Sequence, residues 1–126
     1  MKVLVIDDEK DILEMVSKAL KRNGYEVTVA STIAEAAKQI RYNKWDLIIS
    51  DVMIPYEGGF ELVDSIKATS NTPVIMITGM SEDVLKATIN KADVIMHKPF
   101  SSADLIKRVN ELTAQSQPNS SGAVVS

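Results

Sequence analysis

Residues 3–8 read Val3-Leu4-Val5-Ile6-Asp7-Asp8, four apolar side chains followed at once by two carboxylates. A short apolar run rich in β-branched residues predicts a buried strand, and the acids that follow it would lie at its carboxyl end. The same pattern recurs in residues 47–51, which read Leu47-Ile48-Ile49-Ser50-Asp51. We therefore expect two buried strands that both end in acidic side chains.

Segments with the period of a helix separate the apolar runs. Helices are expected at about residues 10–23, 32–41, 59–68 and 81–90, with a last one after residue 101, and strands at 3–6, 26–30, 47–49, 74–77 and 94–96. Gly24 stands where a glycine commonly ends a helix, and Thr32 with Glu35 forms a capping-box pattern. The alternation predicts an α/β fold, a doubly wound five-stranded parallel sheet with five helices.

The burial patterns of the strands predict their order. Residues 26–30 alternate polar and apolar side chains, as an edge strand does, whereas residues 3–6 and 47–49 are apolar throughout, as central strands are. This favours the flavodoxin-like order 2-1-3-4-5, whose ligand crevice lies beyond the carboxyl ends of strands one and three. Polar residues from four strand ends would meet there, namely Asp7, Asp8, Glu9, Asp51, Thr78 and Lys98.

Composition narrows the classes of function. The 126 residues suit one domain, and a net charge of −3 lacks the basic footprint of a nucleic-acid-binding surface. The chain has no cysteine and one histidine, which excludes disulfides, thiolate metal sites and multi-histidine metal sites within it. No apolar run is long enough to span a membrane, and the first residues do not form a signal peptide. We expect a cytoplasmic protein that binds neither nucleic acid nor membrane.

The acidic crevice favours a divalent cation. Asp7, Asp8 and Asp51 would bring negative charges close together, so either their pKa values rise or a cation joins them. Mg²⁺ fits best, with Mn²⁺ as the alternative, because it takes one or two carboxylates and keeps water or phosphate oxygens as its other ligands. Lys98 adds an ammonium and Thr78 a hydroxyl, and the set suits phosphoryl transfer to a carboxylate.

Together these motifs resemble the receiver domains of response regulators, the CheY-like family of two-component signalling. The resemblance covers about residues 2–114 and rests on Asp7-Asp8, Asp51-Val52-Met53-Ile54-Pro55, Gly58-Gly59, Thr78-Gly79 and Lys98-Pro99-Phe100. We expect a receiver domain over residues 1–115. Residues 116–126, rich in Gln, Pro, Asn, Ser and Gly, are expected to be a disordered tail or a linker remnant.

The resemblance implies a role for each matched residue. Asp51 would accept the phosphoryl group, and Thr78 and Lys98 would contact it. The peptide bond between Lys98 and Pro99 would be cis, which proline permits. The implied Mg²⁺ ligands are Asp8, Asp51 and the backbone carbonyl of Met53, with Asp7 helping through water.

The resemblance also implies partners. The phosphoryl donor would be a histidine kinase or a histidine phosphotransfer protein. Phosphorylation would change the surface around the fourth helix, fifth strand and fifth helix, and so control binding of a downstream protein that the sequence does not name. The chain would act as a monomer or a weak phosphorylation-dependent dimer, and as a switch rather than a multiple-turnover enzyme.

Two departures from the family pattern concern the switch. The residue three positions before the lysine is often aromatic in receivers and is Ile95 here, so an aromatic ring cannot couple to Thr78 in the usual way. Met53 and Met80, two residues after Asp51 and after Thr78, cannot orient an attacking water. We therefore predict slow self-dephosphorylation, which Met80→Glu or Met80→Gln would accelerate.

Two other classes of function remain alternatives. A flavodoxin-like FMN carrier needs a phosphate-cradling loop after the first strand, but residues 7–9 are three acids, and visible absorbance would test this class. A phosphate-ester hydrolase with an aspartyl intermediate needs a second acid/base group and a substrate cap. The chain would be a stand-alone protein or part of a longer regulator or hybrid kinase, and Met1 directly before the first strand favours a natural N-terminus.

Overall fold

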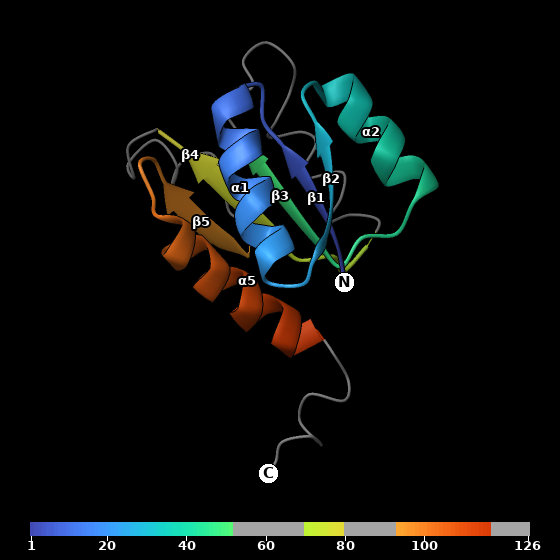
Figure 1. Cartoon of the computed structure of the whole chain (residues 1–126). Helices are drawn as coiled ribbons and strands as arrows, with labels where there is room; N and C mark the ends of the chain where they lie inside the picture. The colour runs from blue at the N-terminus through green and yellow to red at the C-terminus, as the bar shows by residue number, and fades with distance from the viewer. Residues whose placement is uncertain (52–69, 80–92, 117–126) are drawn as a thin grey trace.

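The computed structural model describes residues 1–51, 70–79 and 93–116. Within them lies one five-stranded parallel sheet in the order β2-β1-β3-β4-β5 (Figure 1). The elements are β1 (Lys2–Ile6), α1 (Lys10–Arg22), β2 (Glu26–Ala30), α2 (Ile33–Tyr42), β3 (Leu47–Asp51), β4 (Val74–Thr78), β5 (Val94–His97) and α5 (Ser102–Ser116). The predicted fold class and strand order are confirmed. The helices expected at 59–68 and 81–90, and residues 117–126 of the expected tail, lie outside the described residues.

The central strands are apolar because both of their faces are covered. Every residue of β3 and β4 is buried, and side chains that follow one another along a strand point to opposite faces of the sheet. One face carries a core cluster with residues such as Val5, Ile49 and Ile77, and the other face a cluster with residues such as Leu4 and Ile48. β2 forms one edge of the sheet, as predicted, and its Val29 is 48% exposed.

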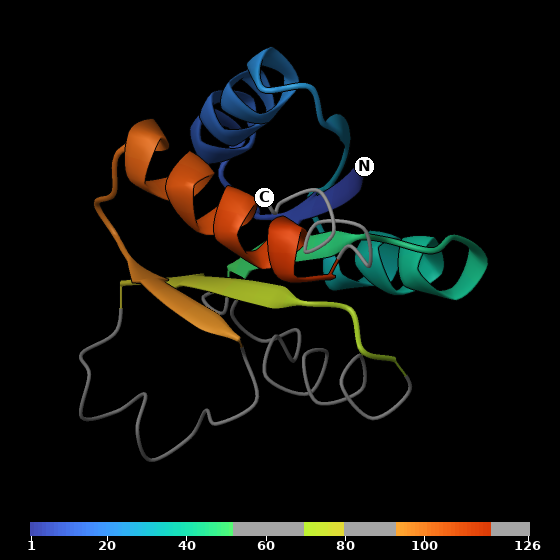
Figure 2. The same ribbon diagram turned by 90° about the horizontal axis from the view of Figure 1, so that it is seen from below.

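Helices α1 and α5 lie side by side on one face of the sheet (Figure 2). Their buried residues recur three or four positions apart, which places them on one stripe of each helix. These residues are Leu13, Val16 and Leu20 of α1 and Leu105 and Val109 of α5. Ala36 of α2 belongs to the cluster on the opposite face. No helix among the described residues is long and apolar enough to cross a membrane.

The predicted helix boundaries have clear physical causes. After α1, Gly24 adopts a φ of +87°, which glycine tolerates better than other residues. At the start of α2, the Glu35 N–H donates to Oγ1 of Thr32 at 3.1 Å, and Oε1 of Glu35 accepts from the Ser31 N–H at 2.7 Å. This is the predicted capping box, with its return bond made to the residue before the cap. The hydrogen bonds that the Glu35 carboxylate accepts, first from the Ser31 N–H and then from the Ser31 hydroxyl, lower the pKa of Glu35.

Helix α5 is tied to the segment before β2 by a tyrosine. The Tyr25 hydroxyl donates to Oδ1 of Asn110 at 2.6 Å and lies 3.1 Å from Oγ1 of Thr113. At the other end of α5, the Asp104 N–H donates to Oγ of Ser101 at 3.1 Å, which confirms the predicted cap. Both ends of the helix that follows β5 are thus held by side-chain hydrogen bonds.

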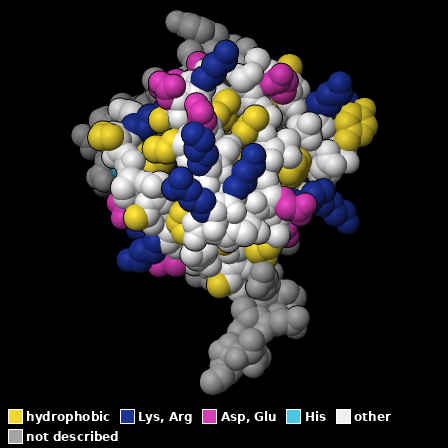
Figure 3. Space-filling view, in the orientation of Figure 1, with side chains coloured by type: hydrophobic (Ala, Val, Ile, Leu, Met, Phe, Trp, Pro, Cys, Tyr) yellow, Lys and Arg dark blue, Asp and Glu magenta, His cyan; other side chains and the backbone are white. Residues whose placement is uncertain are grey.

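In the orientation of Figure 1, α1 faces the viewer. Basic and acidic side chains lie close together over this face, with apolar side chains between them (Figure 3). On α1 itself, Lys18 pairs with Glu14 at 3.4 Å across one turn of the helix. The exposed side of α1 therefore carries mixed charge.

Candidate functional site

The register of the parallel strands brings the predicted site residues to one edge of the sheet. Pairing of β1 with β3 sets Asp7 beside the end of β3, where Asp51 lies. Asp51 in turn pairs with Ile77, so Thr78 follows one position later on β4. The chain leaving β5 stays in the ladder, because the Lys98 N–H donates to the Thr78 carbonyl at 2.7 Å.

Within the described ranges of the chain, four carboxylates gather at this edge. One carboxylate oxygen from each of Asp7, Asp8, Glu9 and Asp51 lies within 4.8 Å of the others. Asp7 and Asp51 are buried, whereas Asp8 and Glu9 are exposed. The predicted convergence of Asp7, Asp8 and Asp51 is therefore observed, and the cluster reaches from the protein interior to solvent.

Among the residues that the structure describes, one ammonium, that of Lys98, faces these acids. The Nζ atom of Lys98 lies 2.8 Å from Oδ2 of Asp51, 2.9 Å from Oε1 of Glu9 and 3.6 Å from Oδ2 of Asp7. Burial alone would lower the pKa of Lys98. The hydrogen bonds to Asp51 and Glu9, together with the charges of Asp51 and Asp7, outweigh burial and raise that pKa. Lys98 therefore stays charged at neutral pH.

Asp7 lies in an environment that disfavours its negative charge. Its Oδ1 accepts the Glu9 N–H at 2.9 Å, but its buried Oδ2 has no hydrogen-bond partner among the described residues. Burial, reinforced by the charges of Asp51 and Glu9, raises the pKa of Asp7 to about 7, although the hydrogen bond from the Glu9 N–H and the charge of Lys98 oppose this shift. A buried carboxylate oxygen without a donor, beside other carboxylates, fits a site for a hard cation with oxygen ligands.

Thr78 supplies the remaining predicted group. The residue is fully buried at the end of β4, and its backbone is held by Lys98. The Lys98–Pro99 peptide bond is cis, as the resemblance implies. Met53, the predicted backbone ligand, lies outside the described residues, as does Met80.

No role was predicted for Glu9 from the sequence. It occupies the N-cap position of α1, where an acid would be expected to cap the helix, yet its side chain makes no capping hydrogen bond. Instead it pairs with Lys98. The available signal was the third consecutive acid after the first strand, and the choice between cap and ion pair depends on side-chain geometry.

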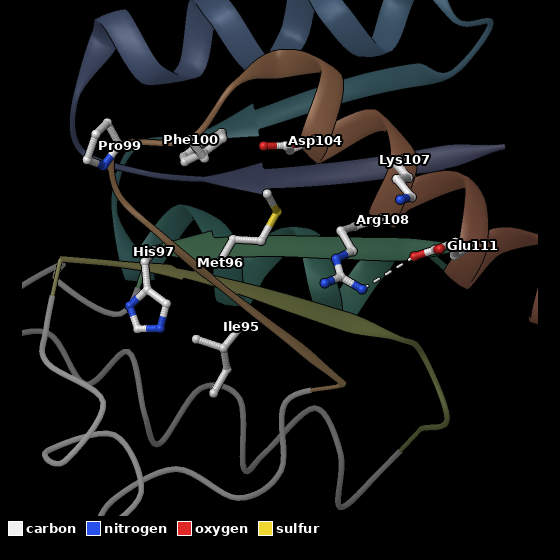
Figure 4. Close-up of a pocket in the computed structure, with 9 residues that line it drawn as sticks. All are labelled: Ile95, Met96, His97, Pro99, Phe100, Asp104, Lys107, Arg108 and Glu111. Atoms are coloured by element: carbon white, nitrogen blue, oxygen red, sulfur yellow. Dashed lines mark ion pairs between the residues drawn. The ribbon is translucent and has the colours of Figure 1, made fainter.

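Apart from the carboxylate cluster, a hollow with a volume of about 420 Å³ lies between β5 and α5 (Figure 4). Met96 points from β5 toward α5, whereas Ile95 and His97 project from the opposite face of the strand (Figure 4). Arg108 and Glu111 form a 3.5 Å ion pair on α5 at its rim. Ile95, at the position that is often aromatic in receivers, is 36% exposed.

Comparison with known proteins assigns the family. The sequence model of the response regulator receiver domain matches residues 3–110. The transcriptional regulatory protein SpaR of Bacillus subtilis is 33% identical over 111 residues, which cover 86% of this chain and 50% of SpaR. The alkaline phosphatase synthesis transcriptional regulatory protein PhoP of Bacillus subtilis is 36% identical over 120 residues, which cover 92% of this chain and 50% of PhoP. The chain thus spans about half the length of these curated relatives.

Solved structures agree. The receiver domain of the Francisella response regulator 1452 has a TM-score of 0.85 and 36% identity, covering 92% of this chain and 98% of its own. The chemotaxis response regulator CheY4 of Vibrio cholerae has a TM-score of 0.78 and 35% identity, covering 88% and 97%. Sequence, fold and site geometry lead to the same conclusion: the chain belongs to the response regulator receiver domain family.

Proposed function

We propose that this chain is a phospho-acceptor switch in which Asp51 takes a phosphoryl group from a phosphohistidine donor with the help of Mg²⁺. The observation that carries the proposal is the buried Asp51 carboxylate, held 2.8 Å from the Lys98 ammonium inside a cluster of four carboxylates. Receiver domains of response regulators interact with histidine kinases or phosphotransfer proteins. The donor proposed here is one of these two classes.

The transfer step follows from the residues present. An oxygen of Asp51 forms a bond to phosphorus while the phosphorus–nitrogen bond of the phosphohistidine breaks, and the imidazole leaves with the electron pair. The Lys98 ammonium stabilises the negative charge on the equatorial oxygens of the phosphoryl group, and the Thr78 hydroxyl donates a hydrogen bond to one of these oxygens. The product is an acyl phosphate on the protein itself. The chain is therefore a switch that assists its own modification rather than a multiple-turnover enzyme.

A divalent cation completes the proposed site. Receiver domains generally use Mg²⁺ at an acidic site. Oδ2 of Asp7, which accepts no hydrogen bond within the described part of the chain, fits such an ion together with the Asp8 and Asp51 carboxylates. When bound, Mg²⁺, or Mn²⁺ in its place, supplies positive charge to the phosphoryl oxygens. Asp8, Asp51 and the Met53 carbonyl would hold the ion directly, and Asp7 would hold it through water.

The output surface is proposed to include β5 and α5 together with the fourth helix, which lies outside the described residues. Lys98 directly follows β5, so a shift of its side chain toward a phosphoryl group acts on the strand that borders the 420 Å³ hollow. The partner is a downstream protein of unknown identity. The beryllofluoride-activated NtrC4 receiver domain, 34% identical with a TM-score of 0.84, is a dimer. A weak phosphorylation-dependent dimer is therefore one form that the output could take, beside a monomer.

Intact-mass spectrometry tests the proposal. The parent chain is incubated with Mg²⁺ and either acetyl phosphate or phosphoramidate, whose phosphorus–nitrogen bond stands in for that of phosphohistidine. We expect the parent to gain one phosphoryl group, Asp51→Asn to gain none, and the exposed-site control Asp11→Asn to behave like the parent. Chelation of Mg²⁺ should abolish the gain. A parent that gains nothing from either donor would contradict the proposed function, and an equal gain in Asp51→Asn would contradict the assigned site.

A further inference from the structure

Glu9 has no part in the transfer step described above, yet it shares the ammonium on which that step depends. The Lys98 Nζ atom lies 2.9 Å from Oε1 of Glu9 and 2.8 Å from Oδ2 of Asp51, two contacts of almost equal length. The Glu9 side chain is 58% exposed, whereas that of Asp51 is 1% exposed. One acid at the rim of the site and one at its base therefore hold the same cation.

We propose that Glu9 is a positioning residue that holds the Lys98 ammonium in the unphosphorylated state and competes with the phosphoryl group for it. The inference rests on the proposed function, because it assumes that a phosphoryl group occupies Asp51. A phosphoryl group brings additional negative charge and strong acceptor oxygens to a site where the Lys98 ammonium is already engaged. Lys98 must then share its donors among the phosphoryl group, Asp51 and Glu9.

The negative charge of Glu9 also disfavours a phosphoryl group on Asp51. A carboxylate oxygen of Glu9 lies within 4.8 Å of one from Asp51, so an anion on Asp51 is repelled by Glu9 as well as deprived of part of Lys98. Removal of this charge should therefore favour the phosphoryl-bearing state once the cation site is filled. Because Glu9 is exposed, its effect must be screened by salt, which a change in packing would not be.

Beryllofluoride, a phosphoryl mimic, provides the test because it measures occupancy of Asp51 without turnover. The affinity of each variant for beryllofluoride is measured by NMR titration at saturating Mg²⁺. The cation site is then filled in every variant, so a changed affinity for Mg²⁺ does not alter the measured affinity for beryllofluoride. The variants are Glu9→Gln, which removes the charge at constant size, and Glu9→Asp, which keeps it. The control is Glu14→Gln on helix α1, which Glu9 precedes; the partner of Glu14, Lys18, lies 3.4 Å away and outside the site.

We expect Glu9→Gln to bind beryllofluoride roughly twofold to fivefold more tightly at low salt, with the gain shrinking at high salt. Glu9→Asp and Glu14→Gln should bind like the parent. Unchanged or weaker binding by Glu9→Gln overturns the inference, as does a gain that persists at high salt or that Glu9→Asp shares in full. A parent that binds no beryllofluoride would instead refute the proposed function, so the two failures are distinguishable.

Discussion

The Nζ atom of Lys98 lies 2.8 Å from Oδ2 of Asp51, so the carboxylate proposed as nucleophile is already paired with the ammonium proposed to contact the phosphoryl oxygens. This pair has a consequence for the two expected ligands of the site. Lys98 repels a divalent cation and attracts an anionic phosphoryl group. Its removal should therefore change the two affinities in opposite directions.

Replacement of Lys98 by Met tests this opposition. We expect Lys98→Met to bind Mg²⁺ more tightly, because four clustered carboxylates lose their competing ammonium. The same variant should bind beryllofluoride more weakly by roughly tenfold or more, because a charged hydrogen bond is lost. Isothermal titration calorimetry measures both affinities. Lys18→Met, which alters an exposed lysine of α1, is the control, and a loss of Mg²⁺ affinity in Lys98→Met would contradict the argument.

The stability of the metal-free protein should depend on Asp7. Its pKa rises from 3.8 to about 7 on folding, chiefly through burial, so between these values the folded chain holds a proton that the unfolded chain has lost. A group that binds more protons in the folded state makes the free energy of unfolding decrease as pH rises. The parent should therefore lose stability relative to Asp7→Asn between about pH 4 and pH 7, with no further change above that range.

Urea unfolding in the presence of a chelator measures this difference, with the fluorescence of the single tryptophan, Trp45, as the signal. The comparison with Asp7→Asn cancels the titration of groups that both proteins share. If the difference in the free energy of unfolding between the two proteins stays constant from pH 4 to pH 8, the raised pKa assigned to Asp7 is contradicted. At pH 8, Mg²⁺ should stabilise the parent more than Asp7→Asn, because a bound cation offsets the buried charge.

Much of the fold could be predicted because parallel strands buried on both faces have a simple signature. Residues 3–6 and 47–49 are apolar throughout, which identified β1 and β3 as central, and the polar alternation of residues 26–30 identified β2 as an edge. The predicted carboxyl ends were a residue or two short at β3, β4 and β5. Backbone pairing there continues through Asp51 and His97, which hydropathy does not mark as strand.

The candidate site could be predicted as far as the sheet topology determines it. The carboxyl ends of parallel strands meet at one edge, which is sufficient to bring Asp7, Asp51 and Lys98 together. The contact between Lys98 and Glu9 depends on side-chain conformations, and the depth at which Asp7 is buried depends on packing around it. Neither has a periodic signature in the sequence. The roles of Met53 and Met80 stay predictions.

The capping box at the start of α2 should contribute to stability independently of the site. Thr32→Ala removes the acceptor of the Glu35 N–H and should lower the free energy of unfolding by about 1 kcal/mol. Thr32→Ser keeps the hydroxyl, so its free energy of unfolding should fall much less. The comparison distinguishes the hydrogen bond of the cap from packing of the Thr32 methyl group. Urea unfolding at neutral pH measures both. Equal losses in the two variants would show that the hydroxyl is not responsible.

The hydroxyl of Tyr25 should matter more to α5 than to the rest of the fold. Tyr25→Phe removes its hydrogen bond to Asn110 and its contact with Thr113, while Thr113 keeps a 2.9 Å hydrogen bond to the Val109 carbonyl. The expected loss in the free energy of unfolding is therefore only about 1 kcal/mol. Tyr42→Phe is the matched control, because Tyr42 is 70% exposed, and its removal of a hydroxyl should change little.

Hydrogen exchange locates the effect of Tyr25→Phe. Because the lost contacts lie near the C-terminal end of α5, backbone amides in the last turns of that helix should exchange faster. The exchange rates of amides in β1 and β3 should rise only by the amount that the loss of global stability causes. Uniformly faster exchange would mean that the hydroxyl stabilises the whole domain rather than this helix end. Since α5 belongs to the proposed output surface, a local effect would identify the Tyr25 contact as a restraint on the element that is proposed to respond to phosphorylation.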